Sequence, residues 1–289
     1  MPWFREKQHH LFYDYCTLIK QKRGIFFQEN FNLKELFYLT VAMRLFGKKE
    51  DRLWLVFRYD FSMLRGQGRW HRLLLRILGA RVQLFTDSAL IAQDLAGATL
   101  LPIPHMPRCD VIAAPTLPIC CWWPGEPREA KGRREIMHLL SHRDARYEMV
   151  FSEELPLPPT TRMKSRQLSP ILPRSAYERQ FSVSDVILLP YDKGTYKSST
   201  SGILVEAVIA GKVPLIKEGG WLAYELRRFG LEELIVDWDD PNFFDTIYPL
   251  LFSNSVREKL AAMQQEYIVF HSKENFGKIF MQQLGSGLG

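Results

Sequence analysis

The first feature of the sequence that could do chemistry is a run of small residues followed by a carboxylate. Residues 200–206 read TSGILVE, and the apolar spacing beyond them predicts a helix beginning near Ser201. The first amides of a helix lack intrahelical partners and lie at the positive end of its dipole, so Ser201, Gly202 and Ile203 could bind an anion such as phosphate. Glu206, one turn further, could accept hydrogen bonds from sugar hydroxyls. A phosphate site beside a hydroxyl site predicts a nucleotide or nucleotide sugar. Alternatively, Glu206 only favours the helix.

These residues need secondary structure on both sides. Residues 186–189 are apolar and uncharged, which predicts a buried parallel strand that Pro190 ends, and Gly211 stands where a helix C-terminal glycine belongs. Strand patterns alternate with helical ones along the chain, which predicts an α/β fold with doubly wound parallel sheets. We expect the other strands at 25–28, 53–59, 82–86, 147–151, 168–172 and 234–236, and the other helices at 33–46, 69–78, from 88, and at 175–182, 221–229, 255–267 and 273–284.

The segment that contains Glu206 resembles the donor-binding core of retaining GT-B glycosyltransferases of the large family four. That family has a helix with a glutamate and an alanine, then a Gly-x-Pro turn and an apolar strand. The matching residues here are Glu206, Ala207, Gly211, Pro214 and Leu215. Relatives that build polysaccharides carry a Tyr-x-x-x-x-Ser-Gly loop, matched by Tyr196, Ser201 and Gly202. The family often has a second glutamate eight positions earlier, where this chain has Ser198.

A distant segment, 118–140, resembles the start of the second domain in the same family. In the family, a glycine is followed six residues later by Lys-Gly, matched here by Gly125, Lys131 and Gly132. Glu126 occupies the place of the family's arginine, so Arg128 is the substitute candidate. The alternative is that these basic residues form a solvated cluster without a ligand.

The resemblance implies two Rossmann-like domains with parallel sheets, the first abbreviated. At 289 residues, 46% of them hydrophobic, the chain can bury two modest cores. We expect an acceptor-side domain at 1–108, a nucleotide-sugar donor domain at 109–254 and terminal helices at 255–289 that fold back across the cleft. The boundary falls near Arg108, after a proline-rich crossover.

The resemblance also implies transfer of a sugar from a nucleotide-diphosphate donor to an acceptor hydroxyl, with retention, in polysaccharide or glycolipid biosynthesis. The acceptor is expected to be a carbohydrate or lipid-linked, and neither a cofactor nor a metal ion is expected. Lys131, Arg128 and the amides of Ser201, Gly202 and Ile203 would stabilise the departing diphosphate. The resemblance implies further contacts: Glu206 to the ribose, Tyr196 and Ser198 near the donor sugar, and the backbone at Ile171 and Leu172 to the base.

The charge of the chain is unevenly distributed. The net charge is +6, and residues 1–110 hold 17 lysines and arginines against 10 acidic residues, so the basic excess lies in the first half. Such a half could contact an anionic membrane surface; a solvated face is the alternative, and nucleic-acid binding rests on charge alone and is not expected.

Residues 111–125 are too short and too rich in proline to span a membrane, and no signal-peptide pattern opens the chain. The spacing of Cys16, Cys109, Cys120 and Cys121 fits neither zinc nor a disulfide framework, so we expect a cytoplasmic protein that can associate with membranes.

Other polar residues give weaker signals. His138 and His142 stand four apart on a predicted helix but lack an evident third metal ligand. His71 and His105 lie where a first-domain residue could meet the reacting sugar, but neither belongs to a motif that we can align, so both are interpreted as structural. Arg58 and Asp60 follow a predicted strand, where they could face a cleft or pair with each other.

Three rival classes of protein remain, and the nucleic-acid binding that rests on charge alone is one of them. A nucleotide-sugar epimerase would share the architecture, but it should carry acidic and histidine catalytic groups that we cannot assign. A catalytically degenerate protein that binds a nucleotide sugar or acts as a scaffold would explain Ser198 and the short first domain.

Overall fold

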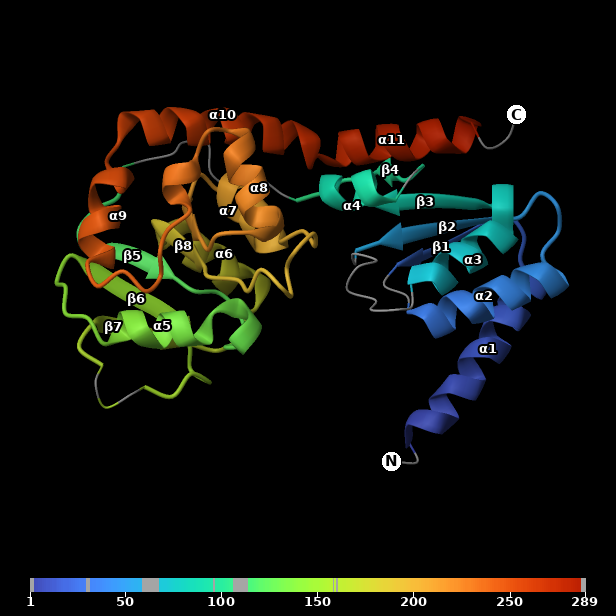
Figure 1. Ribbon diagram of the computed structural model, residues 1–289, viewed down its shortest axis with the longest axis horizontal. Coiled ribbons are helices and arrows are strands. Elements are labelled where there is room, and N and C mark those ends of the chain that lie inside the picture. Colours follow the sequence, from blue (N-terminus) through green and yellow to red (C-terminus); the bar gives the residue numbers. More distant parts are fainter. Residues whose placement is uncertain are drawn as a thin grey trace. The chain divides into compact units, whose positions relative to one another are not determined.

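The computed structural model divides into two compact units, residues Met1–Pro102 and Ile103–Gly289 (Figure 1). It describes residues 3–29, 32–58, 68–95, 97–105, 114–157, 159 and 161–286. The predicted domain boundary at Arg108 lies outside these residues, so its position stays a prediction.

The first unit is a parallel sheet with helical crossovers. In chain order it contains α1 (Trp3–Gln21), β1 (Ile25–Glu29), α2 (Leu33–Phe46), β2 (Arg52–Phe57), α3 (Gly68–Leu78), β3 (Val82–Thr86), α4 (Ala89–Asp94) and β4 (Thr99–Leu100). The strands lie in the order β1-β2-β3-β4, with Phe27 opposite Trp54 and Leu55 opposite Leu84. α2 begins with a capping box, in which Asn32 and Glu35 exchange side-chain and backbone hydrogen bonds.

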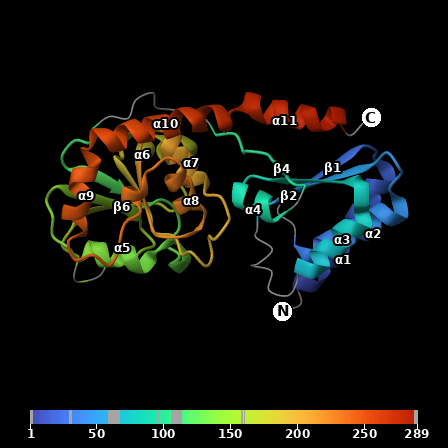
Figure 2. The same cartoon turned by 45° about the horizontal axis from the view of Figure 1, so that its top comes forward.

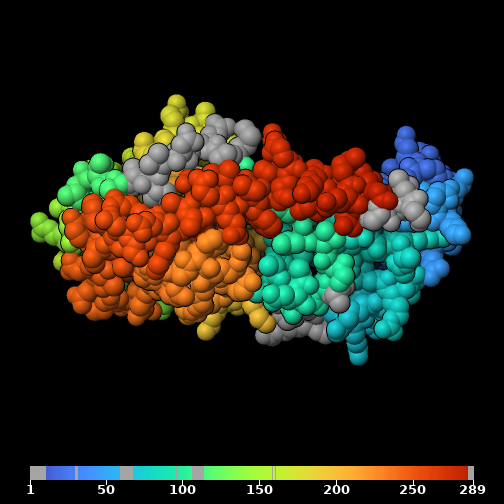
Figure 3. Space-filling view, turned by 90° about the horizontal axis from the view of Figure 1, so that it is seen from above, coloured from blue at the N-terminus to red at the C-terminus, as the bar shows by residue number. Residues whose placement is uncertain are grey.

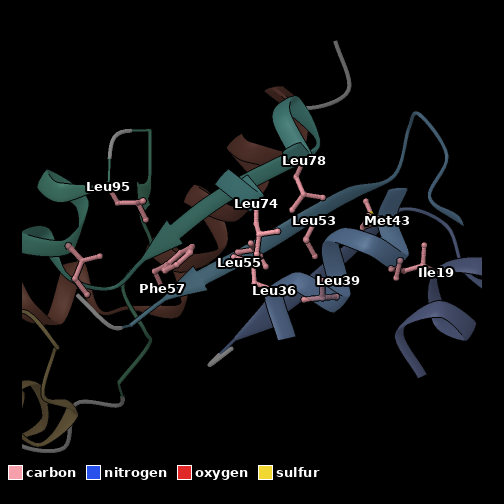
Figure 4. Packing of buried hydrophobic residues seen from close by; sticks show 12 residues of the cluster. Ile19, Leu36, Leu39, Met43, Leu53, Leu55, Phe57, Leu74, Leu78 and Leu95 are labelled. Atoms are coloured by element: carbon pink, nitrogen blue, oxygen red, sulfur yellow. The ribbon is translucent and has the colours of Figure 1, made fainter. Parts of the chain in front are cut away.

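The core of this unit lies between the sheet and its helices. Figure 4 shows Leu53, Leu55 and Phe57 of β2 directed toward side chains of α2 and α3. The helical side of this core consists of Ile19, Leu36, Leu39, Met43, Leu74 and Leu78, all less than 10% exposed. Alternate residues of one strand thus meet the apolar faces of two helices.

The second unit contains a five-stranded parallel sheet in the order β7-β6-β5-β8-β9. Its elements in chain order are β5 (Ile119–Trp122), α5 (Arg133–Leu140), β6 (Tyr147–Ser152), β7 (Lys164–Leu168), α6 (Arg174–Val183), β8 (Val186–Leu189), α7 (Gly202–Ile209), β9 (Val213–Ile216), α8 (Gly220–Arg228), α9 (Phe243–Leu251), α10 (Asn254–Phe270) and α11 (Lys273–Ser286). Every residue of β5, β8 and β9 is buried, as expected for strands that helices cover on both faces (Figure 2). Two parallel α/β sheets confirm the predicted fold class.

α10 lies along one side of the second unit, and α11 follows it in the chain (Figure 3). α10 packs against α7, and Gln264 donates a hydrogen bond to the carbonyl oxygen of Ile209. Among the described helices, none is both long enough and apolar enough to cross a lipid bilayer.

Two predicted strands are wrong. The strand expected at 168–172 lies earlier, at Lys164–Leu168, because β7 is an edge strand of polar residues, KSRQL, without an apolar run to mark it. Instead of a strand at 234–236 there is a 3₁₀ turn, Glu232–Leu234, followed by a single bridge between Ile216 and Ile235. α9, which contains Pro249, was not predicted from the sequence.

Candidate functional site

A pocket lies at the carboxyl ends of β5, β6 and β7, entirely within the second unit. The space in it, open solvent at its mouth included, is about 390 Å³. Aromatic and apolar side chains form most of its wall, and the residues that line it are Trp122, Trp123, Pro124, Gly125, Phe151, Ser152, Leu168, Ser169, Pro170, Leu172, Tyr177 and Ile203. A mostly apolar pocket with a few polar groups is the usual form of a small-molecule site.

The strand order explains why the pocket is here. The chain builds outward from β5 to β6 and β7, and then returns to the other side of β5 to build β8 and β9. The loops that leave β5 and β8 therefore diverge, and ligands of open parallel sheets bind in the crevice at such a point. These two loops carry Lys131 and the start of α7.

The first turn of α7 brings backbone amides without intrahelical partners to this edge. The Ser201 hydroxyl caps the helix by accepting a hydrogen bond from the Leu204 amide, at 3.3 Å. Ile203 lines the pocket, so the N-terminal turn of α7 borders its void. The apolar face of the helix is buried, which fixes the direction of its dipole.

Lys131, in the β5 loop, has its ammonium group beside Gly125 of the pocket wall. Its Nζ lies where it would be 3.1 Å from a Cβ added to Gly125, so a bare glycine backbone admits the ammonium group. Burial lowers the pKa of Lys131, and the nearby charge of Arg128 lowers it further. Its backbone carbonyl accepts a hydrogen bond from the Trp123 indole, at 3.0 Å.

Gly132 lies where the loop after β5 contacts the loop after β8. It adopts φ +86°, in the left-handed region, and an added Cβ would lie 2.3 Å from Pro190 Cγ and 2.4 Å from the Pro190 carbonyl oxygen. The Asp192 amide donates to the Ala130 carbonyl oxygen at 2.9 Å. The Lys-Gly pair therefore places the cation next to a glycine, whose lack of a Cβ permits the close approach to Pro190.

Arg128 stands apart from Lys131 in its surroundings. Its side chain is 60% exposed, and Nε donates to Glu126 Oε2 at 2.7 Å. Hydrogen bonding to Glu126 and the charge of that carboxylate raise the pKa of Arg128. The acid that replaces the family's arginine therefore pairs with the substitute arginine.

Glu206 is held by three side chains from other segments. Tyr177 Oη donates to Oε2 at 2.6 Å, while His105 Nδ1 and Arg174 Nη1 lie 3.5 and 3.7 Å from Oε1. Burial alone would raise the pKa of Glu206, but the hydrogen bonds and the arginine outweigh it and lower that pKa. Glu206 is thus an ionised carboxylate, and it orients a tyrosine that lines the pocket.

His105 contacts the same network from the segment before β5. Its Cε1 would lie 3.3 Å from a Cβ added to Gly202, and its ring meets His271 edge to face at 5.6 Å. His271 donates to the Ile103 carbonyl oxygen, and burial lowers the pKa of His271 to about 4. His271 is therefore neutral at pH 7, beside His105.

The remaining predicted site residues lie around this edge. Tyr196 packs on the buried Tyr191 ring at 4.6 Å, and its carbonyl oxygen would lie 2.5 Å from a Cβ added to Gly220. Ser198 is 3% exposed. Leu172 lines the pocket, whereas the Ile171 side chain is 80% exposed.

Other candidates lie elsewhere. His138 and His142 contact each other at 4.9 Å, and in the described part of the chain no third ligand joins them. In the first unit, His71 is buried in α3, and Arg58 pairs with Glu29 at 3.1 Å and lies 3.9 Å from Asp87. Asp60 lies outside the described residues.

Sequence reasoning missed several residues of this edge. Tyr177 and Arg174 reach Glu206 from α6, 29 and 32 positions earlier, and no local spacing marks them. Trp122 ends β5 and packs on Tyr177 at 5.4 Å. The available signal was the double tryptophan at a strand's carboxyl end, where pocket walls form. His105, interpreted from the sequence as structural, lies beside Glu206.

The fold resembles those of solved glycosyltransferase structures, although no family model and no curated protein matches the sequence. HepE from Anabaena, in complex with UDP, is 10% identical with a TM-score of 0.66, over 95% of this chain and 82% of that one. The α,α-trehalose 6-phosphate synthase of Burkholderia multivorans is 12% identical with a TM-score of 0.64, over 98% and 77%. The corresponding enzyme of Burkholderia xenovorans, in complex with glucose-6-phosphate, is 14% identical with a TM-score of 0.63, over 97% and 78%. The chain has the GT-B fold; the expected shortening of its first unit stays a prediction.

Proposed function

We propose that this chain is a glycosyltransferase that moves a sugar from a nucleotide-diphosphate donor to an acceptor hydroxyl. The observation that carries the proposal is the meeting of three features at one strand edge. An aromatic pocket, a partly buried lysine and the first turn of a helix all lie where two loops diverge from a parallel sheet. An apolar pocket suits a base, and a cation beside free amides suits a diphosphate.

The chemistry needs help for the leaving group. When the bond between the sugar and the diphosphate breaks, negative charge grows on the phosphate oxygen. The Lys131 ammonium and the amides of Ser201, Gly202 and Ile203 would stabilise that charge in a setting that is already organised. Arg128 would add a weaker contribution, because it is exposed and paired with Glu126.

The other residues would orient the donor. Glu206 would hold the ribose, and its bonds to Tyr177 and His105 would fix the carboxylate for that task. The backbone at Ile171 and Leu172 would face the base, and Tyr196 and Ser198 would lie near the donor sugar. Retention, independence from metal ions and a role in polysaccharide or glycolipid assembly belong to the proposal on the basis of the family resemblance alone.

Calorimetric titration of the full chain with UDP, GDP and their sugars tests the donor site. We expect one nucleotide to bind, and Lys131→Ala and Glu206→Gln to weaken it. The matched control is Lys212→Ala, which removes a lysine from the turn between α7 and β9, where it donates to the Ser182 carbonyl oxygen. A folded protein that binds none of these ligands would contradict the proposal.

A second candidate is a degenerate protein that binds the donor without transferring its sugar. Ser198 favours it, because this buried serine stands where the family often has an acid. Donor turnover separates the two: release of free nucleotide from the bound donor, with or without acceptor, supports the enzyme, and binding without any release supports the degenerate protein.

A further inference from the structure

Helix α3 of the first unit carries two apolar stripes, and the core uses only one. His71, Leu74 and Leu78 are buried against the sheet, and Figure 4 shows Leu74 and Leu78 directed into the core. The second stripe is Trp70, Leu73 and Ile77, with exposed fractions of 49%, 43% and 37%. These positions recur at i, i+3 and i+7, so they form one flank of the helix.

The same helix is strongly basic. Arg69, Arg72 and Arg76 are exposed on it, and the sequence contains no acidic residue between Asp60 and Asp87. The Arg69 guanidinium also lies over the Trp70 ring, at 5.7 Å. On α2, Arg44 adds a further positive charge beside the end of α3, where it donates to the Ile77 carbonyl oxygen at 2.5 Å. The exposed apolar flank therefore lies beside a row of arginines that no acid on the helix offsets.

We propose that α3 docks the first unit on an anionic lipid surface. Trp70 would lie at the headgroup level, Leu73 and Ile77 would enter the acyl boundary, and Arg69, Arg72 and Arg76 would contact lipid phosphates. Charge complementarity selects this partner. A nucleic acid would satisfy the arginines, but it offers no apolar phase for the leucine and isoleucine. The docking surface shares no residue with the pocket of the second unit, so it does not depend on the proposed donor site.

Flotation of the full chain with vesicles tests the docking surface. We expect binding to mixed phosphatidylcholine and phosphatidylglycerol vesicles and much weaker binding to phosphatidylcholine alone. Each basic residue near an anionic leaflet contributes about 1 kcal/mol, so Arg69→Gln/Arg72→Gln/Arg76→Gln should lower the partition coefficient roughly a hundredfold. Trp70→Gln/Leu73→Gln/Ile77→Gln should lower it roughly tenfold or more.

Matched variants in the second unit control for charge and hydrophobicity. The first is Arg179→Gln/Lys273→Gln/Lys278→Gln, which removes three exposed cations; the second is Val183→Gln/Val269→Gln/Met281→Gln, which removes three exposed apolar side chains. Both should bind vesicles like the parent chain. Circular dichroism of every variant establishes that it is folded.

Three results would overturn the docking surface. The first is a folded parent chain that ignores anionic vesicles, and the second is a charge control that loses as much binding as the α3 arginine variant. The third is salt-dependent binding of the parent to duplex DNA or RNA, lost with the α3 arginines, without vesicle binding. UDP titration of the α3 variants tests the donor site separately. If the chain does not bind UDP, the proposed donor site is wrong, but the vesicle result still decides the docking surface.

Discussion

The two parallel sheets differ in strand order, and the difference indicates at which of them a ligand site is expected. In the described part of the first unit, the order β1-β2-β3-β4 follows the sequence, so the chain moves across the sheet in one direction. In the second unit the order β7-β6-β5-β8-β9 reverses at β5, and the loops after β5 and β8 diverge. A crevice at such a reversal is the ordinary site for ligands.

The cations at the carboxyl edges of the two sheets also differ in their surroundings. In the first unit Arg58 lies near Glu29 and Asp87, so its positive charge is met by carboxylates. In the second unit the Lys131 ammonium is partly desolvated and lies beside a glycine at the pocket wall. Of these two described cations, Lys131 is therefore the one that lies at a pocket wall.

The largest expected effect comes from separating the two loops of the second edge. Gly132→Ala would place a methyl group against Pro190 at a left-handed φ. The backbone strain costs roughly 1–2 kcal/mol and the overlap about as much again, so we expect a loss of about 3 kcal/mol in the free energy of unfolding and a marked loss of UDP affinity. Urea denaturation measures the free energy of unfolding, and calorimetry measures the UDP affinity.

The control for this change is Gly230→Ala in the same unit. Gly230 also has a positive φ, of +63°, but the nearest atom to an added Cβ is 3.9 Å away. The Gly230→Ala variant should lose only about 1 kcal/mol in the free energy of unfolding and keep its UDP affinity. Equal losses in both variants would show that strain alone, and not contact between the loops, explains the Gly132 result.

The second prediction concerns the cation of the β5 loop. Lys131→Gln should weaken UDP binding roughly tenfold to a hundredfold, because a hydrogen bond to a charged group contributes about 1.5–3 kcal/mol. Burial lowers the pKa of Lys131, so the parent should lose UDP affinity as the pH rises through that lowered value, before an ordinary lysine would lose its proton. Calorimetry across alkaline pH should show this decline in the parent and not in Lys131→Gln.

Arg128→Gln is the comparison for Lys131. Because Arg128 is exposed and already paired with Glu126, we expect a change in UDP affinity of no more than about threefold. A larger loss than that of Lys131→Gln would assign the main diphosphate contact to the arginine.

The third prediction concerns the support of Glu206. Tyr177→Phe removes a hydrogen bond to a carboxylate and should cost about 1.5 kcal/mol in the free energy of unfolding, with a several-fold loss of UDP affinity. In a double-mutant cycle with Glu206→Gln the two changes should not add. The control is Tyr147→Phe, which removes the bond to the Phe244 carbonyl oxygen and should cost stability without changing UDP affinity. Additive effects would mean that Tyr177 does not act through Glu206.

The two edges also differ in how much of them could be predicted from the sequence. β8 and α7 were predictable because an apolar run, a serine cap and a C-terminal glycine lie within one short segment. The partners of Glu206 were not, since Tyr177 and His105 reach it only after the sheet has formed. β7 was misplaced for another reason: it is an edge strand of polar residues without an apolar run, and its sequence resembles that of a loop. Local signals thus predicted β8 and α7, whereas the contacts that hold the Glu206 carboxylate come from distant parts of the chain.

The smallest expected effect tests the contrast between the edges directly. Arg58→Gln removes the cation at the carboxyl edge of the first sheet, where it is 30% exposed and paired with Glu29. If only the second edge binds the donor, UDP affinity should change less than twofold, and stability should fall by no more than about 1 kcal/mol, as for other partly exposed ion pairs. Calorimetric titration with UDP of Arg58→Gln and Lys131→Gln, side by side, compares the two edges. A tenfold loss of UDP affinity in Arg58→Gln would mean that charge at the first edge also serves the donor, and strand order alone would then be an insufficient guide to the site.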